Sequence, residues 1–462
     1  MTIDSTTQTL VQSLATFASG TEIDAAPEEA RTQAKLCLLD TIGCIIAGAE
    51  TPEARVLFEA EMALNGRPED WKEDTVARVF GYLGDTLELN DLIGGHSSIG
   101  IVTALIAKTM VRDVAGTDLI RAIIAGTETT ARVYDSVVGR LKPYTETAIV
   151  VPSYFNAFGA AAACGIVEGL EEEQLAHALA ISSTLNSWAP AEVIFGDGGT
   201  VKPMLFGANP ASIAIQSVGY AAAGMTGPQT IIESPIGLMA GIAKEFNPRA
   251  MRENENWFIT IPQRKLQAAC GYTHSAIDAV NTMKLTREQA QSVTAIRIAI
   301  PEFYISAVGK SGAPVSSNDA RFHIGYLVAL ALQGEYPILP KHTIEFDEFF
   351  RDELTSRLSN IVQIIPLGDD EINSTKPYNV SRVEVELSTG EVFTASCSAP
   401  KGSAENPLSD DEVIDKFHRL VAPQLSAEGA EEMLQSVMNV DSADDVSPLM
   451  RRVFATVTKP FG

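Results

Sequence analysis

Residues 155–170 read FNAFGAAAACGIVEGL, a run in which alanine, glycine and cysteine separate a few larger apolar side chains. Residues 210–228, PASIAIQSVGYAAAGMTGP, have a similar composition. Small side chains let helix backbones approach closely, as a helix that is buried on several sides requires. The two stretches therefore predict a tightly packed helical core.

The helical pattern extends upstream. Residues 28–48 read EEARTQAKLCLLDTIGCIIAG, in which Ala34, Leu38, Ile42 and Ile45 recur at steps of three and four. That spacing predicts a helix. Nearly every segment from residue 28 to about 245 reads as helix, so the first half of the chain is expected to form a large helical bundle.

The pattern changes after about residue 290. Residues 293–303, VTAIRIAIPEF, alternate and end at a proline, and residues 381–397, SRVEVELSTGEVFTASC, alternate on either side of a Thr389-Gly390 turn. Both predict strands of an antiparallel sheet. Residues 320–334, ARFHIGYLVALALQG, are expected to form a helix between those strands. The second half of the chain therefore contains a smaller α+β domain.

The expected fold class is mainly α, with a large all-helical bundle domain and a smaller α+β domain that contains an antiparallel sheet. Residues 1–265 are expected to form the first part of the helical domain and residues 266–400 the α+β domain. Residues 401–462 are expected to be a helical tail that returns to the first domain, with Ser409 as an N-cap.

Composition and charge exclude several classes of partner. The 462 residues carry a net charge of −25, which would repel nucleic acid and an anionic membrane surface. A few Lys or Arg side chains can reverse the potential inside one cleft, so a small anionic metabolite is the expected partner. No run reaches the ~18 apolar residues of a membrane span, and the first residues do not resemble a signal peptide.

The cysteines favour a reducing compartment. There are five, an odd number, and they are scattered without a CxxC pair. They are Cys37, Cys44, Cys164, Cys270 and Cys397. Such usage is typical of reduced thiols rather than of a disulfide framework. A soluble, cytoplasmic protein is expected.

Three expected helices begin beside polar or cationic residues. The helix starts are at Ser97, at Pro152-Ser153 and at Asn209-Pro210. The preceding loops carry His96, then Lys142 and Tyr144, then Lys202. A helix start presents free N–H groups and a partial positive charge, which can seat a carboxylate or phosphate. Simple capping and surface charge are the alternative for any one of them.

Lys202 lies in a glycine-rich segment, residues 195–212, FGDGGTVKPMLFGANPAS. Pro203 biases Lys202 toward an extended backbone, and the glycines allow a ligand to approach closely. Such a lysine can hold a carboxylate or, once burial lowers its pKa, accept a proton. The segment is not a GxGxxG dinucleotide fingerprint. A flexible surface loop is the alternative.

Residues 263–280, QRKLQAACGYTHSAIDAV, bring Arg264, Lys265, Cys270 and His274 together. Cys270 and His274 are one helical turn apart, but no second ligand pair of matching spacing follows, so no metal site is predicted. His274 is a candidate general acid or base, and a buried structural histidine is the alternative. The GGHSSIG stretch is not a GxSxG nucleophile elbow. The residues alone thus indicate an enzyme that moves protons on an anionic metabolite without a cofactor.

The order and spacing of these segments resemble the MmgE/PrpD family, which includes 2-methylcitrate dehydratase, cis-aconitate decarboxylase and iminodisuccinate epimerase. The resemblance covers nearly the whole chain. It is carried by residues 36–50 (LCLLDTIGCIIAGAE), 96–107 (HSSIGIVTALIA), 155–170, 201–234 (VKPMLFGANPASIAIQSVGYAAAGMTGPQTIIES), 268–280 (AACGYTHSAIDAV) and 401–417 (KGSAENPLSDDEVIDKF). It implies a cofactor-free active site between the two domains and a homodimer.

The resemblance also implies site residues. Four positions of the family's motifs have counterparts in this chain. Asp91 corresponds to an acidic residue of the Asp-Asp pair and His96 to the histidine of His-Pro-Ser. Lys202 corresponds to the lysine of Lys-Arg-x-His-x-Gly, and His274 to a later histidine. Several motif positions differ. The acidic pair reads Asn90-Asp91, and Ser97 replaces the proline of His-Pro-Ser. The Gly-Trp-His segment reads Val151-Pro152-Ser153, and Leu205 replaces the histidine of Lys-Arg-x-His-x-Gly. A pocket without two histidines is a poor match for dehydration of a tricarboxylate.

The family's reactions share the breaking or making of a C–H bond next to a carboxylate, with enolate-like charge in the transition state. Epimerisation requires only two acid/base groups on opposite faces of one carbon. The hypothesis is therefore an epimerase of an amino- or imino-dicarboxylate, with iminodisuccinate as the first guess. A lyase that dehydrates 2-methylcitrate or decarboxylates cis-aconitate is the alternative, and a non-catalytic carboxylate-binding relative is a second.

The hypothesis gives each candidate residue a role. Lys202 and Tyr144 would transfer the protons, and His96 or His274 could replace either of them. Asp91 would orient a partner. Carboxylates would be seated by Arg264, Lys265 and the helix starts at Ser97 and Ser153.

Overall fold

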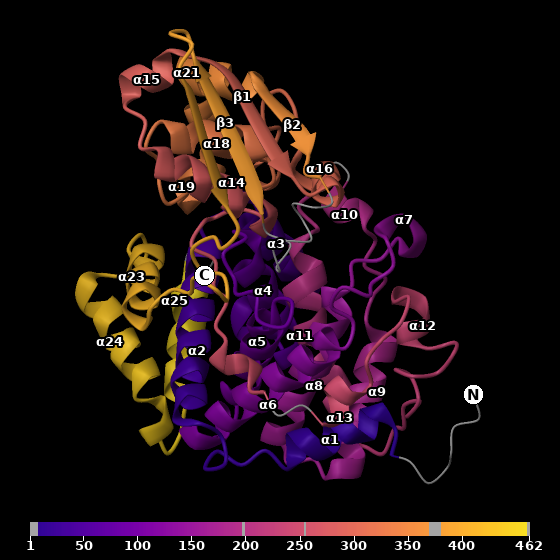
Figure 1. The fold of residues 1–462 in the computed structure, drawn as a ribbon. Coiled ribbons are helices and arrows are strands. Elements are labelled where there is room, and N and C mark those ends of the chain that lie inside the picture. Colours follow the sequence, from indigo (N-terminus) through magenta and orange to yellow (C-terminus); the bar gives the residue numbers. More distant parts are fainter. Residues whose placement is uncertain (1–7, 196–198, 254–255, 369–379, 460–462) are drawn as a thin grey trace.

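The computed structural model describes residues 8–195, 199–253, 256–368 and 380–459. These residues form a large helical unit with a smaller α+β unit stacked on one end of it (Figure 1). The expected class, mainly α with an α+β portion, is confirmed. Two separate hydrophobic cores correspond to the two units.

The helical unit is built from both ends of the chain. Its first part comprises α1 (Leu10–Ser19), α2 (Glu28–Gly48), α3 (Pro52–Asn65), η1 (Pro68–Asp70), α4 (Glu73–Thr86), α5 (Ser97–Thr109), α6 (Gly116–Asp135), α7 (Tyr144–Thr147), α8 (Pro152–Glu168), α9 (Glu172–Leu185), α10 (Glu192–Phe195), the π-helical η2 (Met204–Ala208), α11 (Asn209–Ala222), α12 (Leu238–Ile242), α13 (Arg249–Arg252) and η3 (Phe258–Thr260). Its last part comprises α23 (Asp410–Val421), α24 (Ala427–Met438), η4 (Val440–Ser442) and α25 (Ser447–Thr458).

The α+β unit lies between these two parts in the sequence. It comprises α14 (Gly271–Met283), α15 (Arg287–Gln291), β1 (Val293–Ile300), α16 (Glu302–Val308), α17 (Ser317–Arg321), α18 (Ile324–Leu332), α19 (Pro340–Ile344), α20 (Phe346–Arg351), α21 (Glu353–Asn360), β2 (Val362–Pro366), β3 (Ser381–Leu387) and β4 (Val392–Cys397).

Helix α2 forms where the periodicity placed it, and its second half is buried on all sides. Every residue from Leu36 to Gly48 is buried. One side of α2 packs on α4, α5 and α6, and the C-terminal helices α23, α24 and α25 cover the other side (Figure 1). A Cβ on Gly43 would lie 3.2 Å from the Phe417 ring, so α23 approaches α2 closely.

The small residues of α8 permit the close helix packing that the sequence predicted. A Cβ on Gly159 would lie 1.9 Å from the Thr130 hydroxyl of α6, and one on Gly126 would lie 2.8 Å from the Gly159 carbonyl. Only glycine fits at such distances. Helix α8 also packs on α5, α9 and α11, which makes it the centre of the bundle.

The sheet has the order β2-β1-β3-β4 and is mixed. The pairs β1–β3 and β3–β4 are antiparallel as expected, with the hairpin turn at Thr389-Gly390. The β1–β2 pair is parallel, and strand β2, which the sequence pattern did not predict, makes the sheet mixed. A parallel neighbour needs a crossover connection, and helix α21 runs directly into β2. Val383, Val385 and Leu387 are buried in the core of this unit.

The helix expected over residues 320–334 is interrupted. Helix α17 ends at Arg321 and α18 begins at Ile324. The His323 side chain causes this break locally, because its Nδ1 accepts a hydrogen bond from the Tyr326 backbone N–H at 3.1 Å and so caps α18. The interruption leaves Arg321 at the end of a separate short helix.

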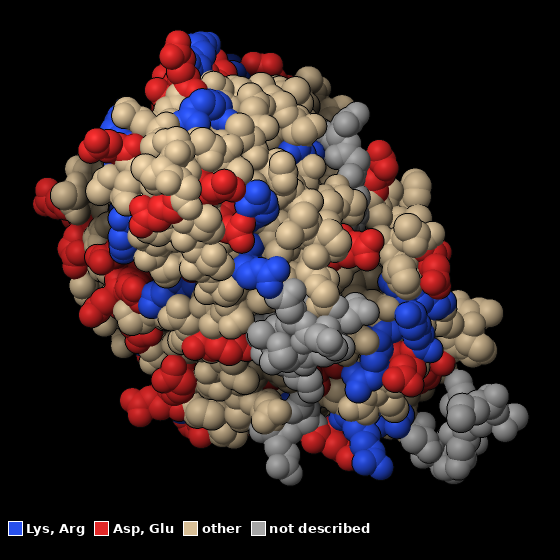
Figure 2. All heavy atoms as spheres, turned by 45° about the horizontal axis from the view of Figure 1, so that its top comes forward, with Lys and Arg blue, Asp and Glu red and all other residues tan. Residues whose placement is uncertain are grey.

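No single helix within the described ranges is long and apolar enough to cross a membrane. Helices α2 and α3 taken together meet the criteria of length and composition, but they are bent by 85° where they join. The face shown in Figure 2 is mostly uncharged, with acidic and basic side chains scattered over it and acidic ones gathered along its left edge. That distribution agrees with the net charge of −25.

Candidate active site

Two buried lysines meet at the junction of the two units. The Lys202 Nζ lies 2.9 Å from the Asp85 Oδ2 and also bonds to the Glu88 Oε1. The Lys265 Nζ lies 2.6 Å from the Glu88 Oε2. One carboxylate thus bridges two amino groups. Lys202, Lys265, Asp85 and Glu88 are called the lysine–carboxylate cluster below.

A close helix contact brings Lys202 to α4. Lys202 directly precedes a continuous helix that begins at Pro203 and runs through η2 into α11. A Cβ on Gly207 of η2 would lie 2.3 Å from the Gly81 carbonyl of α4, so both backbones can approach only because these residues are glycines. Asp85 lies one turn further along α4 than Gly81, and Glu88 follows the end of α4 with φ 54°.

This continuous helix corrects the expected helix start at Asn209-Pro210. Asn209 is already helical, and its side chain donates to the Ser187 hydroxyl at 2.8 Å instead of capping. The helix therefore starts directly after Lys202, and its first N–H groups are used locally, since Met204 and Leu205 donate to the Val201 and Lys202 carbonyls at 2.9 and 3.0 Å. Residues 196–198 of the glycine-rich segment lie outside the described residues.

Lys265 is positioned by the segment that links the two units. The backbone around Arg264 forms a bridge with Asp91, and the Leu92 N–H donates to the Gln263 carbonyl at 2.8 Å. The Arg264 N–H donates to the Gly402 carbonyl at 2.9 Å. The linker is therefore fixed from both sides, and Lys265 extends from it toward Glu88.

The loop between α4 and α5 carries Asp91 and His96. Asp91 is buried and accepts hydrogen bonds from the Ser98 N–H, at 3.3 Å, and from the Ser98 hydroxyl. It thereby caps α5 from outside the helix. Ser97, the expected helix start, is the first helical residue of α5, and its buried hydroxyl has no hydrogen-bond partner within the described part of the chain.

His96 occupies the N-cap position itself, in a left-handed conformation with φ 77°. The Asn90 side-chain amide donates to the His96 Nδ1 at 3.0 Å. The His96 ring stacks on Phe206 with a centroid separation of 5.3 Å, and the Lys202 Nζ lies 4.9 Å from the centroid of the same ring. Phe206 therefore places His96 and Lys202 in one neighbourhood.

His274 lies on α14, and its Nε2 donates to the Ala269 carbonyl at 3.0 Å. That bond leaves Nδ1 as the ring's acceptor. Burial, with a smaller contribution from the Lys265 charge, lowers the pKa of His274 to about 3. The same two causes lower the pKa of His96 well below its usual value. Both histidines are therefore neutral near pH 7.

Burial also shifts the other titratable groups of the site. It lowers the pKa of Lys202 and of Lys265, because a charged amine loses its hydration there. It raises the pKa of Asp91 to about 6. The site therefore contains amines that release a proton more readily than exposed lysines do.

Tyr144 belongs to a different cluster from Lys202. Its side chain hydrogen-bonds to Tyr272 of α14, whose ring stacks on Tyr304 of α16 with centroids 3.8 Å apart. Burial raises the pKa of Tyr144. The structure thus places Tyr144 at the junction between the units, while Lys202 is engaged by Asp85 and Glu88.

Arg264 and Ser153 are also held by other groups. The Arg264 guanidinium contacts α2, where it bonds to the Gln33 Oε1 at 2.7 Å and to the Cys37 Sγ at 3.3 Å. The Ser153 hydroxyl accepts from the Asn186 side-chain amide at 3.0 Å. Lys142 donates to the Ala240 carbonyl at 2.7 Å. Of the predicted cations, Lys202 and Lys265 are the two that the structure brings together.

Sequence reasoning missed Asp85 and Glu88. Their signal is present, because Asp85, Glu88 and Asp91 recur every three residues, with Leu87 and Leu89 between them. A buried carboxylate requires a cationic or hydrogen-bonding partner. Three of them in a core segment therefore indicate that buried cations lie nearby.

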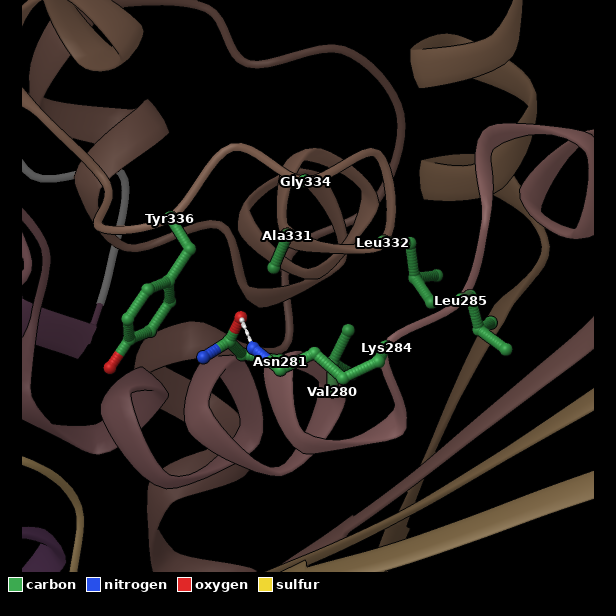
Figure 3. A pocket seen from close by; sticks show the side chains of 8 residues that line it. All are labelled: Val280, Asn281, Lys284, Leu285, Ala331, Leu332, Gly334 and Tyr336. Carbon is green, nitrogen blue, oxygen red and sulfur yellow. Dashed lines mark hydrogen bonds between the residues drawn. The ribbon is translucent and has the colours of Figure 1, made fainter.

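A surface hollow in the α+β unit lies away from the cluster. It has a volume of about 390 Å³ and is lined by Val280, Asn281, Lys284, Leu285, Ala331, Leu332, Gly334 and Tyr336. Figure 3 shows the Lys284 amino group turned back to the Asn281 side-chain oxygen, 3.3 Å away. The hollow is at the opposite end of α14 from His274, and the amino group of its lysine already bonds to Asn281, so we do not assign the reaction to it.

Within the described ranges, no group of three or more His, Cys, Asp or Glu side chains could hold a metal ion. Cys270 and His274 therefore have no third ligand among these residues. The groups that the structure brings to the junction are amines, carboxylates, neutral imidazoles and the Tyr144 phenol.

The chain matches known proteins over nearly its whole length. The family profile of the MmgE/PrpD N-terminal domain matches residues 12–251, and that of the MmgE/PrpD C-terminal domain matches residues 268–442. Cis-aconitate decarboxylase from Aspergillus terreus is 22% identical over 96% of this chain and 96% of its own. Cis-aconitate decarboxylase from Homo sapiens is 23% identical over 96% of this chain and 94% of its own. The chain therefore belongs to the MmgE/PrpD family.

Proposed function

We propose that the protein is a cofactor-independent enzyme that transfers a proton at the carbon next to a carboxylate of a small polycarboxylate. The observation that carries this proposal is the lysine–carboxylate cluster, in which buried Lys202 and Lys265 share Glu88. Amines of lowered pKa can act as bases in their neutral form and as electrostatic stabilisers in their charged form. Both roles are needed when an enolate-like charge develops.

In the proposed reaction neutral Lys202 removes the proton from the carbon next to the carboxylate. Charged Lys265 stabilises the negative charge that then develops on that carboxylate. His96 exchanges the proton on the opposite face of the carbon, because it contacts the same Phe206 ring as Lys202. His96 thus replaces Tyr144, whose hydroxyl is engaged with Tyr272. Asp91 orders the start of α5 beside His96.

Epimerisation of an imino-dicarboxylate such as iminodisuccinate is the first candidate. It needs one proton donor and one acceptor and no further group for a departing hydroxyl. Epimerisation is supported by Leu205 and Ser153, which stand at positions where the family motifs carry histidines. A homodimer is part of the same proposal.

A lyase reaction is the second candidate. The observation that favours it is the name of the relatives, cis-aconitate decarboxylase in both fungus and human. Loss of CO₂ leaves the same type of carbanion, which a lysine or histidine can protonate. The two candidates thus differ in the bond that breaks and not in the groups that stabilise the charge.

Proton NMR in D₂O separates these candidates. The purified protein is incubated with iminodisuccinate, cis-aconitate and 2-methylcitrate in separate tubes, with the Lys202→Met variant as control. Loss of the α-proton signal of iminodisuccinate with a change of diastereomer supports the epimerase. Formation of CO₂ or of a new alkene from a tricarboxylate supports the lyase. No exchange with any substrate contradicts the proposal.

A further inference from the structure

Arg321 of α17 is a buried arginine with unused hydrogen-bond donors. It is 1% exposed, and its Nη1 lies 3.3 Å from the Glu53 Oε1. Its Nε and Nη2 have no hydrogen-bond partner within the described part of the chain. Native proteins pair nearly all buried polar groups, so a guanidinium with two unpaired nitrogens requires an explanation.

Arg321 borders the lysine–carboxylate cluster. Its carbonyl accepts from the Cys270 N–H at 2.9 Å, at the start of the helix that carries His274. Asp85, which pairs with Lys202, is close enough to act on the Arg321 charge. Glu53 lies in the first turn of α3, so the Arg321–Glu53 pair connects the α+β unit to the helical unit.

The Arg321–Glu53 ion pair is too weak for a structural link between the two units to explain why Arg321 is buried there. A guanidinium that pairs fully with a carboxylate usually makes two short hydrogen bonds of about 2.7–2.9 Å. Arg78 does so in this chain, with its Nε 2.7 Å and its Nη2 2.9 Å from the two oxygens of Glu61. Arg321 uses one nitrogen at a longer distance, and the Glu53 Oε2 has no partner among the described residues.

The free nitrogens lie on one edge of the guanidinium. The N–H groups of Nε and Nη2 point in the same direction and match the spacing of two carboxylate oxygens. An edge that is buried, unpaired and next to the cluster is suited to a second carboxylate of the ligand. A monocarboxylate would leave that edge unpaired.

We propose that Arg321 is a specificity-determining residue that binds the substrate carboxylate remote from the reacting carbon, through its Nε and Nη2, and so selects polycarboxylates over monocarboxylates. The inference rests on the proposed function for the position of the reacting carbon. It can be tested without turnover, because it concerns the recognition of a carboxylate.

The test measures binding of succinate and of its monoamide, succinamate, by calorimetry. The two ligands differ in one carboxylate, and succinamate is a monocarboxylate. The wild-type protein should bind succinate roughly 100-fold more tightly, as expected for a buried charge-assisted pair. Arg321→Gln should bind both ligands with similar affinity. Arg78→Gln is the matched control, since its Nε and Nη2 already bind Glu61, and it should keep the wild-type preference.

A second variant covers the case in which Arg321→Gln does not fold. Arg321→Lys keeps the charge but cannot form the two-bond edge, so its preference should fall to roughly tenfold. A wild-type protein without preference, or variants that retain the full preference, would overturn the inference. A preference that depends on Arg321 in a protein without proton exchange would instead uphold the inference and reject the proposed function.

Discussion

At the scale of single residues, Lys202 combines complete burial with two acidic partners. We expect Lys202→Met to lower turnover by at least about 10³-fold, because both the proton acceptor and a charge next to the enolate are lost. Asp85 loses its cationic partner in this variant, so the melting temperature should fall without loss of folding. Turnover is measured by the NMR assay and folding by circular dichroism.

Lys108 provides the matched control. It is also a buried lysine, with its Nζ 2.5 Å from the Glu168 Oε2, but it lies at the end of α5 away from His96. Lys108→Met should lower stability to a similar extent and retain near-normal kcat. Equal loss of kcat in both variants would assign Lys202 a structural role and contradict the proposed mechanism.

Glu128 gives a prediction about pH and stability. It is buried on α6, where its Oε1 accepts from the Ile259 N–H at 2.9 Å, and burial raises its pKa to about 7 from an ordinary value of 4.5. Between these two pH values the folded protein holds a proton that the unfolded chain has released. The contribution of Glu128 to the free energy of unfolding therefore falls as pH rises through this window.

The variant Glu128→Gln lacks this titration. The unfolding free energy of the wild-type protein relative to this variant should decrease between pH 5 and pH 8 by on the order of 1–3 kcal/mol. Urea unfolding at both pH values measures the difference. A difference that does not change with pH would show that Glu128 remains charged throughout.

The local sequence identified the two lysines of the lysine–carboxylate cluster but not its two carboxylates. Lys202 and Lys265 were predicted because a proline and a pair of basic residues mark them in the sequence. Their carboxylate partners were not predicted, since Asp85 lies 117 residues from Lys202 along the chain. A pairing of that separation depends on how helices pack, which no local pattern contains.

At the scale of elements, the contact between α4 and η2 sets the position of Lys202. A Cβ on Gly207 would lie 2.3 Å from the Gly81 carbonyl, so Gly207→Ala must push the two helices apart. We expect this variant to lose roughly 1–3 kcal/mol of stability, as overpacking typically costs. Its kcat should fall as well, because Lys202 moves away from Asp85 and Glu88.

Gly219→Ala is the control for that prediction. Gly219 lies in α11, the helix that continues η2, and nothing lies within 4 Å of a Cβ built on it. Alanine is favoured over glycine in a helix interior by about 1 kcal/mol. Gly219→Ala should therefore be as stable as the wild-type protein or more stable, with unchanged kcat. Thermal unfolding and steady-state kinetics of the pair test whether the α4–η2 contact, rather than helix propensity, controls the site.

At the scale of the whole molecule, sequence periodicity predicted which segments form helices but not which other segments cover them. Helix α2 was found from its spacing, but the spacing could not indicate that α23 from the far end of the chain would bury its outer face. Strand β2 joined the sheet in parallel because α21 provides a crossover. Both features depend on contacts between distant segments, and the first of them contributes to the junction. Lys416 of α23 donates to the Leu89 carbonyl at 2.7 Å, directly beside Glu88.

The net charge of the molecule gives the final prediction. The cluster contains two lysines and two carboxylates, so it does little to offset the overall charge of −25 that an anionic substrate meets on approach. Repulsion between exposed charges extends over about 30 Å at 0.01 M salt and about 8 Å at 0.15 M. We therefore expect kcat/KM to increase a few-fold, roughly 2–10-fold, when NaCl is raised over this range. Tetramethylammonium chloride should have the same effect, because the effect depends on screening and not on a bound cation. A kcat/KM that decreases with salt would mean that the cations near the entrance attract the substrate more strongly than the remaining surface repels it.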